Sequence, residues 1–394
     1  MRRLTPLLAV LALALAACGG SGNGSSDSGP IKVGLIVSLT GNYTPLGSEN
    51  RNAVNLAVKQ INDAGGLLGR QLQVITRDDQ TKPDQSVLAF NDLKGQGIVA
   101  VLGSSFGNSA LATLPLAERE KIPYLSLSAA DQQVEPIRRY VFMTPARATV
   151  YAERLLQYYQ GVGTTKVAVA HDTKSAFAVS GYEATKRLAG KYGVQLVGDE
   201  QFETTTTDFS PTFTHVRNSG AQVLEVWATG APGVTVTKQF ATSGLKMKLA
   251  LTGAEASVLW MQPSGPAAEG VLLDSSIGVV GPHVPNSPLK QAIMAMATPY
   301  QRQYGHYPPQ FALDGASAVQ LLAAAIKKAG STDRDKIRDA LEGLTLLMPN
   351  GEYRYSASDH AGLSTDFVAM VEVKNGQFVP TEWGQQQLAK VATG

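Results

Sequence analysis

The stretch Gly103-Ser104-Ser105-Phe106-Gly107 fits the G-x-S-x-G pattern of a serine nucleophile held on a sharp turn. Asp314 or Asp333, followed by His360, would complete the Ser…Asp…His order of an α/β-hydrolase. However, the turn follows only the third expected strand, and no HGGG-like segment precedes it to supply an oxyanion hole. Asp359-His360 lies in a polar turn that we expect to be solvated. We therefore interpret the serine turn as part of a ligand cleft, and we keep serine hydrolysis as the alternative.

Other reaction chemistries have weaker support in the sequence. The five histidines show neither H-x-x-x-H nor H-E-x-x-H spacing, so we predict no metal site. The chain has no G-x-G-x-x-G and no phosphate-binding P-loop pattern, so we predict no nucleotide and no other cofactor. It also lacks a run of Lys and Arg or an aromatic-basic stripe, which argues against nucleic acid as a partner. We expect a protein that is not an enzyme.

The only cysteine of the 394 residues, Cys18, directly follows an apolar run from Leu7 to Ala17. With Arg2 and Arg3 before it, this run has the layout of a secretory signal and is too short to span a membrane. Residues 1–17 are thus predicted to be a signal peptide, and residues 18–30, rich in Gly and Ser, a flexible linker. Removal of the signal would remove two of the 34 basic residues. The 32 basic residues that remain would then equal the 32 acidic residues in number.

The residues Leu15-Ala16-Ala17-Cys18 resemble a bacterial lipobox. That resemblance implies cleavage before Cys18 and acylation of its thiol, which would anchor the chain through lipid alone. We expect an extracytoplasmic, membrane-anchored lipoprotein at a cell surface or in a periplasm.

After this N-terminal segment, strand and helix patterns alternate from Ile31 onward, with short connections. Such repeated βα units predict parallel sheets covered by helices on both faces. In the first half, we predict strands at 31–39, 71–79, 97–103 and 122–128, and helices at 49–66, 83–93 and 108–120. In the second half, we predict strands at 166–172, 194–202, 221–228 and 247–253, with helices at 150–160, 182–193, 209–220 and 235–244.

The last third of the chain has a less regular pattern. Helices are predicted at 289–304 and 314–329, the second buried against the first sheet, and a hairpin at 366–380 around Asn375-Gly376. The expected fold class is α/β, with two doubly wound parallel-sheet lobes.

Two segments resemble the Leu/Ile/Val-binding type of solute-binding protein, of the type I periplasmic-binding class. They are "IKVGLIVSLTGNYTPLGSENRNAVNLAVKQINDAGGLLGRQLQVITRDDQTKPDQSV" and, more weakly, "YQRQYGHYPPQFALDGASAVQLLAAAI". The resemblance implies three crossings between the lobes, near residues 147, 281 and 349. Lobe one would then hold 31–147 plus 282–348, and lobe two 148–281 plus 349–394. It also implies a small-molecule ligand between the lobes, delivery to an ABC permease, and a monomer.

The resemblance also points to the residues of the cleft. The family's carboxylate-binding hydroxyls fall on Gly107 and Ala130, and its ammonium-binding acid falls near Glu255. Leu46 stands where a tyrosine often covers the ligand, and Phe177 and Thr229 fall near two further tyrosines. The other expected contacts are Ser105, Phe106, Asn108, Ser128 and Ala129.

Because the amino-acid clamp is incomplete, we expect an apolar or aromatic ligand with one or two polar groups, favoured over free leucine, isoleucine or valine. A sensory role with the same cleft stays open beside import.

Overall fold

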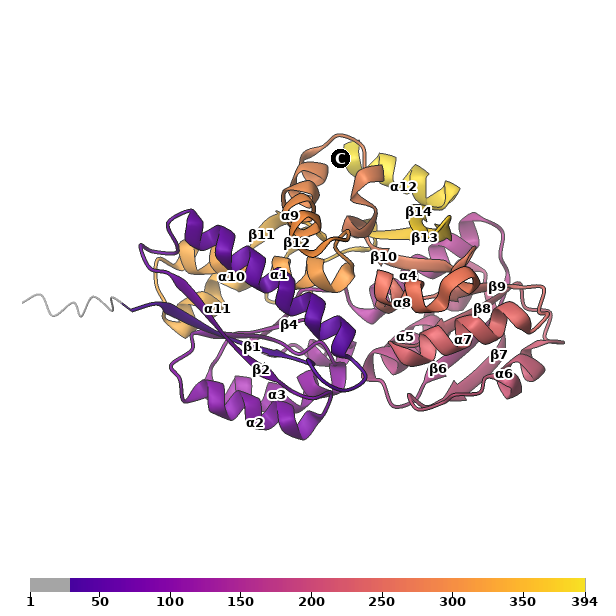
Figure 1. Cartoon of the computed structure of the whole chain (residues 1–394), viewed down its shortest axis with the longest axis horizontal. Helices are drawn as coiled ribbons and strands as arrows, with labels where there is room; N and C mark the ends of the chain where they lie inside the picture. The colour runs from indigo at the N-terminus through magenta and orange to yellow at the C-terminus, as the bar shows by residue number, and fades with distance from the viewer. Residues whose placement is uncertain (1–28, 394) are drawn as a thin grey trace, which may run out of the picture.

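The computed structural model describes residues 29–393 and contains two α/β lobes that meet along one side of each (Figure 1). The predicted signal peptide and Cys18 lie outside the described residues. The last two residues of the expected linker belong to the folded body, because the Gly29 carbonyl accepts a hydrogen bond from Arg70 Nε at 2.6 Å.

The first lobe is built on a five-stranded parallel sheet in the order β2-β1-β3-β4-β5. Its strand β1 has the sequence IKVGLIV and is almost entirely buried, as expected where helices cover both faces of a sheet. The bounds are β1 Ile31–Val37, β2 Leu72–Asp78, β3 Ala100–Gly103, β4 Tyr124–Ser126 and β5 Val141–Met143.

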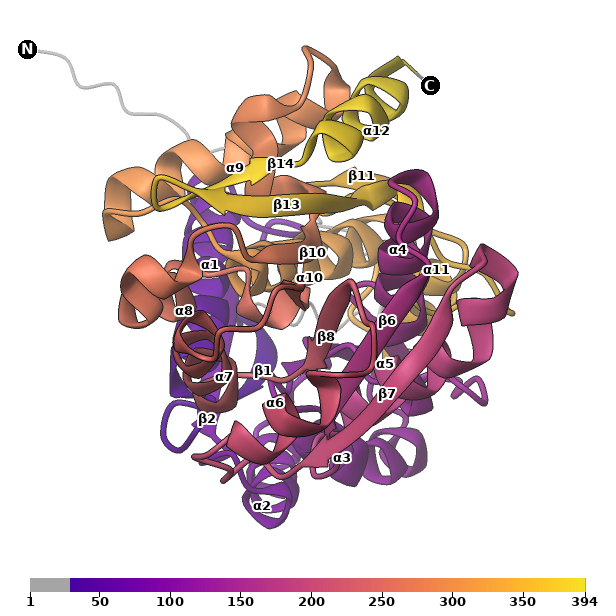
Figure 2. The ribbon, with the colours of Figure 1, turned by 90° about the vertical axis from the view of Figure 1, so that its right-hand side faces the viewer.

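The second lobe holds a seven-stranded sheet in the order β14-β13-β10-β9-β8-β6-β7. Its parallel part is extended by β13, which pairs antiparallel with β10, so the end of the chain completes this lobe (Figure 2). The bounds are β6 Lys166–Asp172, β7 Gln195–Phe202, β8 Val223–Trp227, β9 Lys248–Leu251, β10 Leu272–Ser276, β13 Val368–Lys374 and β14 Gln377–Pro380. A separate two-stranded sheet joins β11 Thr345–Met348 and β12 Gly351–Arg354.

Twelve α-helices surround these sheets in the described part of the chain. They are α1 Thr44–Asp63, α2 Pro83–Lys94, α3 Gly107–Glu120, α4 Ala148–Gly161, α5 Ala176–Leu188, α6 Ser210–Val216, α7 Ala231–Thr242, α8 Val258–Ser264, α9 Pro288–Tyr304, α10 Gln310–Ala329, α11 Arg334–Glu342 and α12 Glu382–Thr393. None of the described helices has both the length and the hydropathy that crossing a membrane would need.

Helix α10 connects the core of the first lobe to the space between the lobes. Its Ala- and Leu-rich sequence is buried over most of its length, against α1 and against strands β3 and β4 of the first sheet. Pro309 precedes its first turn and Gly330 ends it in the left-handed region, with φ of 58°. The helix starts four residues earlier than predicted, which adds Gln310 to Leu313 to its first turn.

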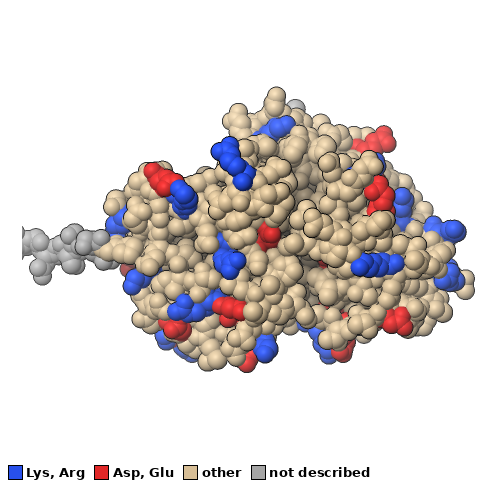
Figure 3. Space-filling model, in the orientation of Figure 1, with Lys and Arg blue, Asp and Glu red and all other residues tan. Residues whose placement is uncertain are grey.

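The predicted fold class is confirmed: two lobes with parallel sheets are present. The hairpin is also present, and Asn375 and Gly376 both have positive φ, as a type I′ turn requires. Lys, Arg, Asp and Glu are interspersed over the face in Figure 3, with acidic atoms visible in the hollow where the lobes meet.

Candidate functional site

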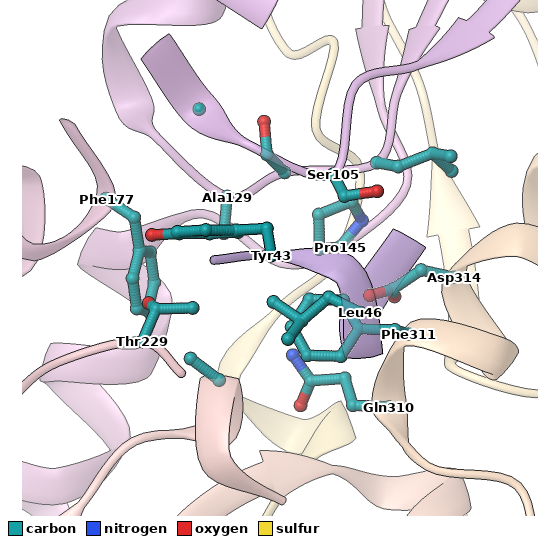
Figure 4. A pocket seen from close by; sticks show the side chains of 14 residues that line it. Tyr43, Leu46, Ser105, Ala129, Pro145, Phe177, Thr229, Gln310, Phe311 and Asp314 are labelled. Carbon is teal, nitrogen blue, oxygen red and sulfur yellow. The ribbon is translucent and has the colours of Figure 1, made fainter. Parts of the chain in front are cut away.

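A cavity lies between the two lobes. On the side of lobe one it is bounded by the turns that come after β3 and β4, the place where open α/β sheets bind ligands. Its wall is mainly apolar, with a few polar side chains (Figure 4). The lining residues are Tyr43, Leu46, Ser105, Gly107, Leu127, Ser128, Ala129, Pro145, Phe177, Thr229, Ala254, Gln310, Phe311 and Asp314.

Most of the predicted contact residues meet in this cavity although they come from distant parts of the sequence. Those that line it are Leu46, Ser105, Gly107, Ser128, Ala129, Phe177 and Thr229. Glu255 lines an adjoining pocket instead, which shares Leu46, Ala254 and Phe311 with the first.

Three further predicted contacts line neither pocket. Phe106 packs on Tyr43, with ring centroids 4.7 Å apart. Ala130 is fully buried. Asn108 links the lobes: its amide nitrogen donates to the Lys174 carbonyl and its amide oxygen accepts from the Ala176 N–H, both at 3.0 Å.

Tyr43 lines the cavity with an aromatic ring three residues before Leu46, the position at which the family resemblance would place a tyrosine. It precedes α1 in lobe one, and its hydroxyl reaches across to Thr229 of lobe two. Burial raises the pKa of Tyr43 to about 12, and the hydroxyls of Thr229 and Ser175 partly offset this rise. Tyr43, Leu46 and Phe311 form a small apolar cluster of their own, against which Phe106 packs.

The first turn of α10 brings two polar side chains and one ring to the cavity. Gln310 and Asp314, four residues apart, share a helix face, and Phe311 lies beside them. The Gln310 side chain is engaged at both its nitrogen and its oxygen, since it donates to the Tyr151 hydroxyl at 2.8 Å and accepts from the Ser276 N–H at 2.9 Å.

Asp314 is only partly engaged. Asn350 donates to its Oδ1 at 2.6 Å, while its Oδ2 is buried without a hydrogen-bond partner. Burial raises the pKa of the Asp314 carboxyl well above its usual range, and the hydrogen bond from Asn350 opposes that rise.

In the adjoining pocket, the Glu255 carboxyl packs against the first turn of α7. A Cβ on Gly233 would lie 2.2 Å from Glu255 Oε1, so only glycine allows this approach. Burial raises the pKa of Glu255 well above its usual range, against a smaller opposing effect of the Gly230 N–H. Oε1 has no hydrogen-bond partner.

The structure gives the serine turn no catalytic partner among the described residues. Ser105 Oγ donates to Asn50 Oδ1 at 2.7 Å, so its hydroxyl is held by α1 and not by a histidine. His360, which we expected to be solvated, is instead buried: it stacks on Phe142 at 4.2 Å and bonds the Val141 carbonyl at 2.8 Å. It lines a different pocket from Ser105, so the order Ser…Asp…His does not bring a triad together.

Sequence reasoning missed Tyr43, Gln310 and Phe311, and it considered Asp314 only as a catalytic acid. The double proline at 308–309 was an available signal for a helix start, and hence for a first turn at Gln310. No comparable signal marked Tyr43, which lies in a loop.

Comparison with known proteins gives consistent results. The sequence pattern of a family described as "Periplasmic binding protein" matches residues 30–377. The Leu/Ile/Val-binding protein homolog 1 of Brucella melitensis biotype 1 is 25% identical over 324 residues, covering 81% of this chain and 84% of the relative. The leucine-, isoleucine-, valine-, threonine-, and alanine-binding protein of Pseudomonas aeruginosa is 24% identical over 387 residues, covering 97% and 96%.

Solved structures share the fold. An extracellular ligand-binding receptor from Rhodopseudomonas palustris HaA2 superposes with a TM-score of 0.82 at 20% identity, covering 90% of this chain and all of the other. An ABC-transporter solute-binding protein from R. palustris, in complex with benzoate, gives a TM-score of 0.78 at 21% identity, covering 89% and 95%. One from R. palustris BisB5, in complex with 3,4-dihydroxybenzoic acid, gives 0.78 at 22% identity, with the same coverage.

Proposed function

This chain belongs to the periplasmic binding protein family, and from that premise we propose that it closes its lobes around a small organic molecule and delivers it to an ABC importer. The expected likeness to Leu/Ile/Val-binding proteins is confirmed, and this family consists of solute-binding proteins, not enzymes. The observation that carries the proposal is the cavity between the lobes, whose wall combines side chains of both.

For the ligand, we propose a mainly apolar or aromatic molecule with one or two polar groups. The rings of Tyr43, Phe177 and Phe311 line the cavity, and neither Gly107 nor Ala130 offers a side-chain hydroxyl. Each buried polar group of a ligand needs a partner, so a free amino acid would lose the side-chain partners of its carboxylate. The benzoate and 3,4-dihydroxybenzoic acid of the two neighbours support an aromatic occupant in this fold.

The test is a thermal-shift screen of the mature chain against aromatic acids, amines, alcohols and the branched-chain amino acids, with calorimetry of every hit. A ligand at 100 times its Kd stabilises the folded state by about 2.7 kcal/mol, which such a screen detects. Submicromolar binding of leucine, isoleucine or valine, weakened at least tenfold by Glu255→Ala, would contradict the proposed ligand class. A screen with no hit of any class would contradict the binding function itself.

We propose further that Cys18 carries the lipid anchor and that the mature chain is an extracytoplasmic monomer. A single acyl chain anchors weakly, so stable attachment needs the several chains that a bacterial lipoprotein carries. The test compares the wild-type chain with Cys18→Ala in cells given a labelled fatty acid. Label on the Cys18→Ala variant would show that the anchor lies elsewhere.

Opening and closing require a hinge, which we propose lies at the lobe crossings near residues 147, 281 and 349. These positions divide the chain into 31–147 plus 282–348 and 148–281 plus 349–394. Hydrogen exchange with and without a ligand from the screen tests this division: protection should change at the crossings and at the cavity wall, and not within the two sheets.

A further inference from the structure

We infer that the ligand of this cleft carries an ammonium group and no carboxylate, with Asp314 as its counter-charge. The inference rests on the proposed function, because it names the chemical class that the same cavity would take. Its starting point is Asp314, which lines the cavity and is 1% exposed; its Oδ2 is buried without a hydrogen-bond partner.

An unpartnered buried acceptor is costly, so its presence in a cavity wall calls for a donor from the occupant. The groups around Asp314 do not supply that donor. Asn350 already bonds Oδ1, and Gln310, one turn away, is engaged with Tyr151 and Ser276. A cation beside Asp314 would both donate to Oδ2 and favour the charged form of the carboxyl, which burial alone disfavours.

The charges around the cleft have one sign. None of the described residues that line either pocket is Lys, Arg or His. The acids are Asp314 in the main cavity and Glu49 and Glu255 in the adjoining one. Glu49 is engaged with Tyr300 and lies 3.4 Å from His306, whereas Glu255 keeps an unpartnered oxygen.

The aromatic residues of the cavity wall favour a cation, as the acidic residues do. The negative faces of aromatic rings attract organic cations, and the attraction is stronger where the cation is desolvated. Tyr43, Phe177 and Phe311 line the same cavity as Asp314. Rings and a buried acid together suit an ammonium ion with an apolar body.

A ligand carboxylate has fewer partners here. The Ser105 hydroxyl donates to Asn50, and the Ser128 hydroxyl lies 3.2 Å from Ser126 Oγ, which can accept from it because the Ser126 hydroxyl itself donates to Gln133 Oε1. The main-chain donors at the start of α3, next to Gly107, and the unpartnered hydroxyl of Thr229 remain available to an anion. This is why the carboxylate is the decisive comparison in the test.

The experiment titrates the mature chain by calorimetry with three probes that share a phenyl ring: 2-phenylethylamine, 2-phenylethanol and 3-phenylpropionate. We expect the amine to bind at least tenfold more tightly than either of the others. Preferential binding of the propionate or the alcohol would overturn the inference and leave the binding function standing. No binding of the amine, with a hit of another class in the wider screen, would overturn it in the same way.

Two variants locate the counter-charge. Asp314→Asn keeps the acceptor for Asn350 and should weaken the amine at least tenfold while changing the alcohol less than twofold. Asp274→Asn is the matched control, since Asp274 is equally buried with an unpartnered Oδ2 but lines neither pocket. The wild-type probe series decides the ligand class even if a variant fails to fold. An equal loss of amine binding in both variants would remove Asp314 from the role.

Discussion

Two buried aspartates, Asp79 and Asp314, differ in how completely they are bonded. Asp79 uses both oxygens: Oδ1 accepts from Ser38 at 2.6 Å and from the Thr81 N–H at 3.0 Å, and Oδ2 accepts from Ser104. Asp314 uses only Oδ1. Asp79 does not line the cavity, whereas Asp314 does.

The difference separates two uses of a buried carboxylate. The Asp79 network ties the ends of β1 and β3 beneath the serine turn, and so fixes the shape of the lobe-one wall. Asp314 leaves an oxygen unbonded at a cost to stability, which a ligand can recover. In this pair of residues, the fully bonded carboxylate lies away from the cavity and the partly bonded one lines it.

The largest expected effect is on the free energy of unfolding. Asp79→Ala leaves two buried serine hydroxyls without their acceptor and should destabilise the chain by about 3 kcal/mol. Asp314→Ala removes one bonded oxygen and should cost only about 1 kcal/mol. Urea unfolding measures both, and equal losses would break the comparison.

A smaller effect, on lobe closure and ligand affinity, is expected where lobe one and lobe two are in contact. Asn108→Ala removes both hydrogen bonds between the start of α3 and lobe two, so the closed form should lose about 1.4 kcal/mol and ligand affinity should fall about tenfold. Small-angle scattering should report a larger radius of gyration. Asn91→Ala, at an exposed position of lobe one, is the control. An unchanged radius and Kd would mean that this contact does not hold the lobes together.

The next effect depends on pH. Glu225 is fully buried in lobe two, and burial raises the pKa of its carboxyl despite bonds from Trp227 and Thr185. The stability of the neutral form is complete below the unfolded-state pKa of about 4.3 and is lost as pH rises through the higher folded-state value. Glu225→Gln should avoid this loss and gain about 1 kcal/mol over the wild type at pH 8 relative to pH 4.

Urea unfolding at the two pH values measures that gain. The exposed Glu183 on α5 provides the control variant, Glu183→Gln, which should keep the wild-type pH dependence. A gain that is the same at both pH values would show that ionisation of Glu225 is not its source.

The smallest effect concerns the serine turn. Ser105→Ala removes the bond to Asn50 and should cost about 0.5 to 1 kcal/mol. A fluorophosphonate probe should label wild type and variant equally, at background level. Labelling that depends on Ser105 would show that its hydroxyl is a nucleophile and not only a structural group. That result would overturn the comparison for this residue.

Sequence patterns predicted the elements that repeat and missed those that do not. Strand β6 was predicted at its observed bounds because its apolar run ends at a clear polar boundary. Strands β5 and β10 were not predicted, nor were α8, α11, α12 and the pair β11–β12. β5 has only three residues, and β11 and β12 have four each, too short for periodicity to be informative.

The site could be predicted only for the residues that the βα repeat places in the turns after strands. Turns after β3 and β4 must face the cleft in such a sheet, so Ser105, Gly107, Ser128 and Ala129 could be placed in advance. Asp314 reaches the cavity through the packing of α10 on α1 and the first sheet, between segments that lie far apart in the sequence. Local patterns carry no information about such a contact.

The position of Trp227 gives the protein an optical reporter. Its ring packs on Phe177 of the cavity wall, with centroids 5.4 Å apart, and a Cβ on Gly181 would overlap it at 2.0 Å. Trp260 lines the adjoining pocket, whereas Trp383, the third tryptophan of the chain, packs on Tyr158 and lines neither pocket. Because one indole packs on a residue of the cavity wall and a second lines the adjoining pocket, ligand entry should change the intrinsic fluorescence, and occupancy can be followed in real time without a label.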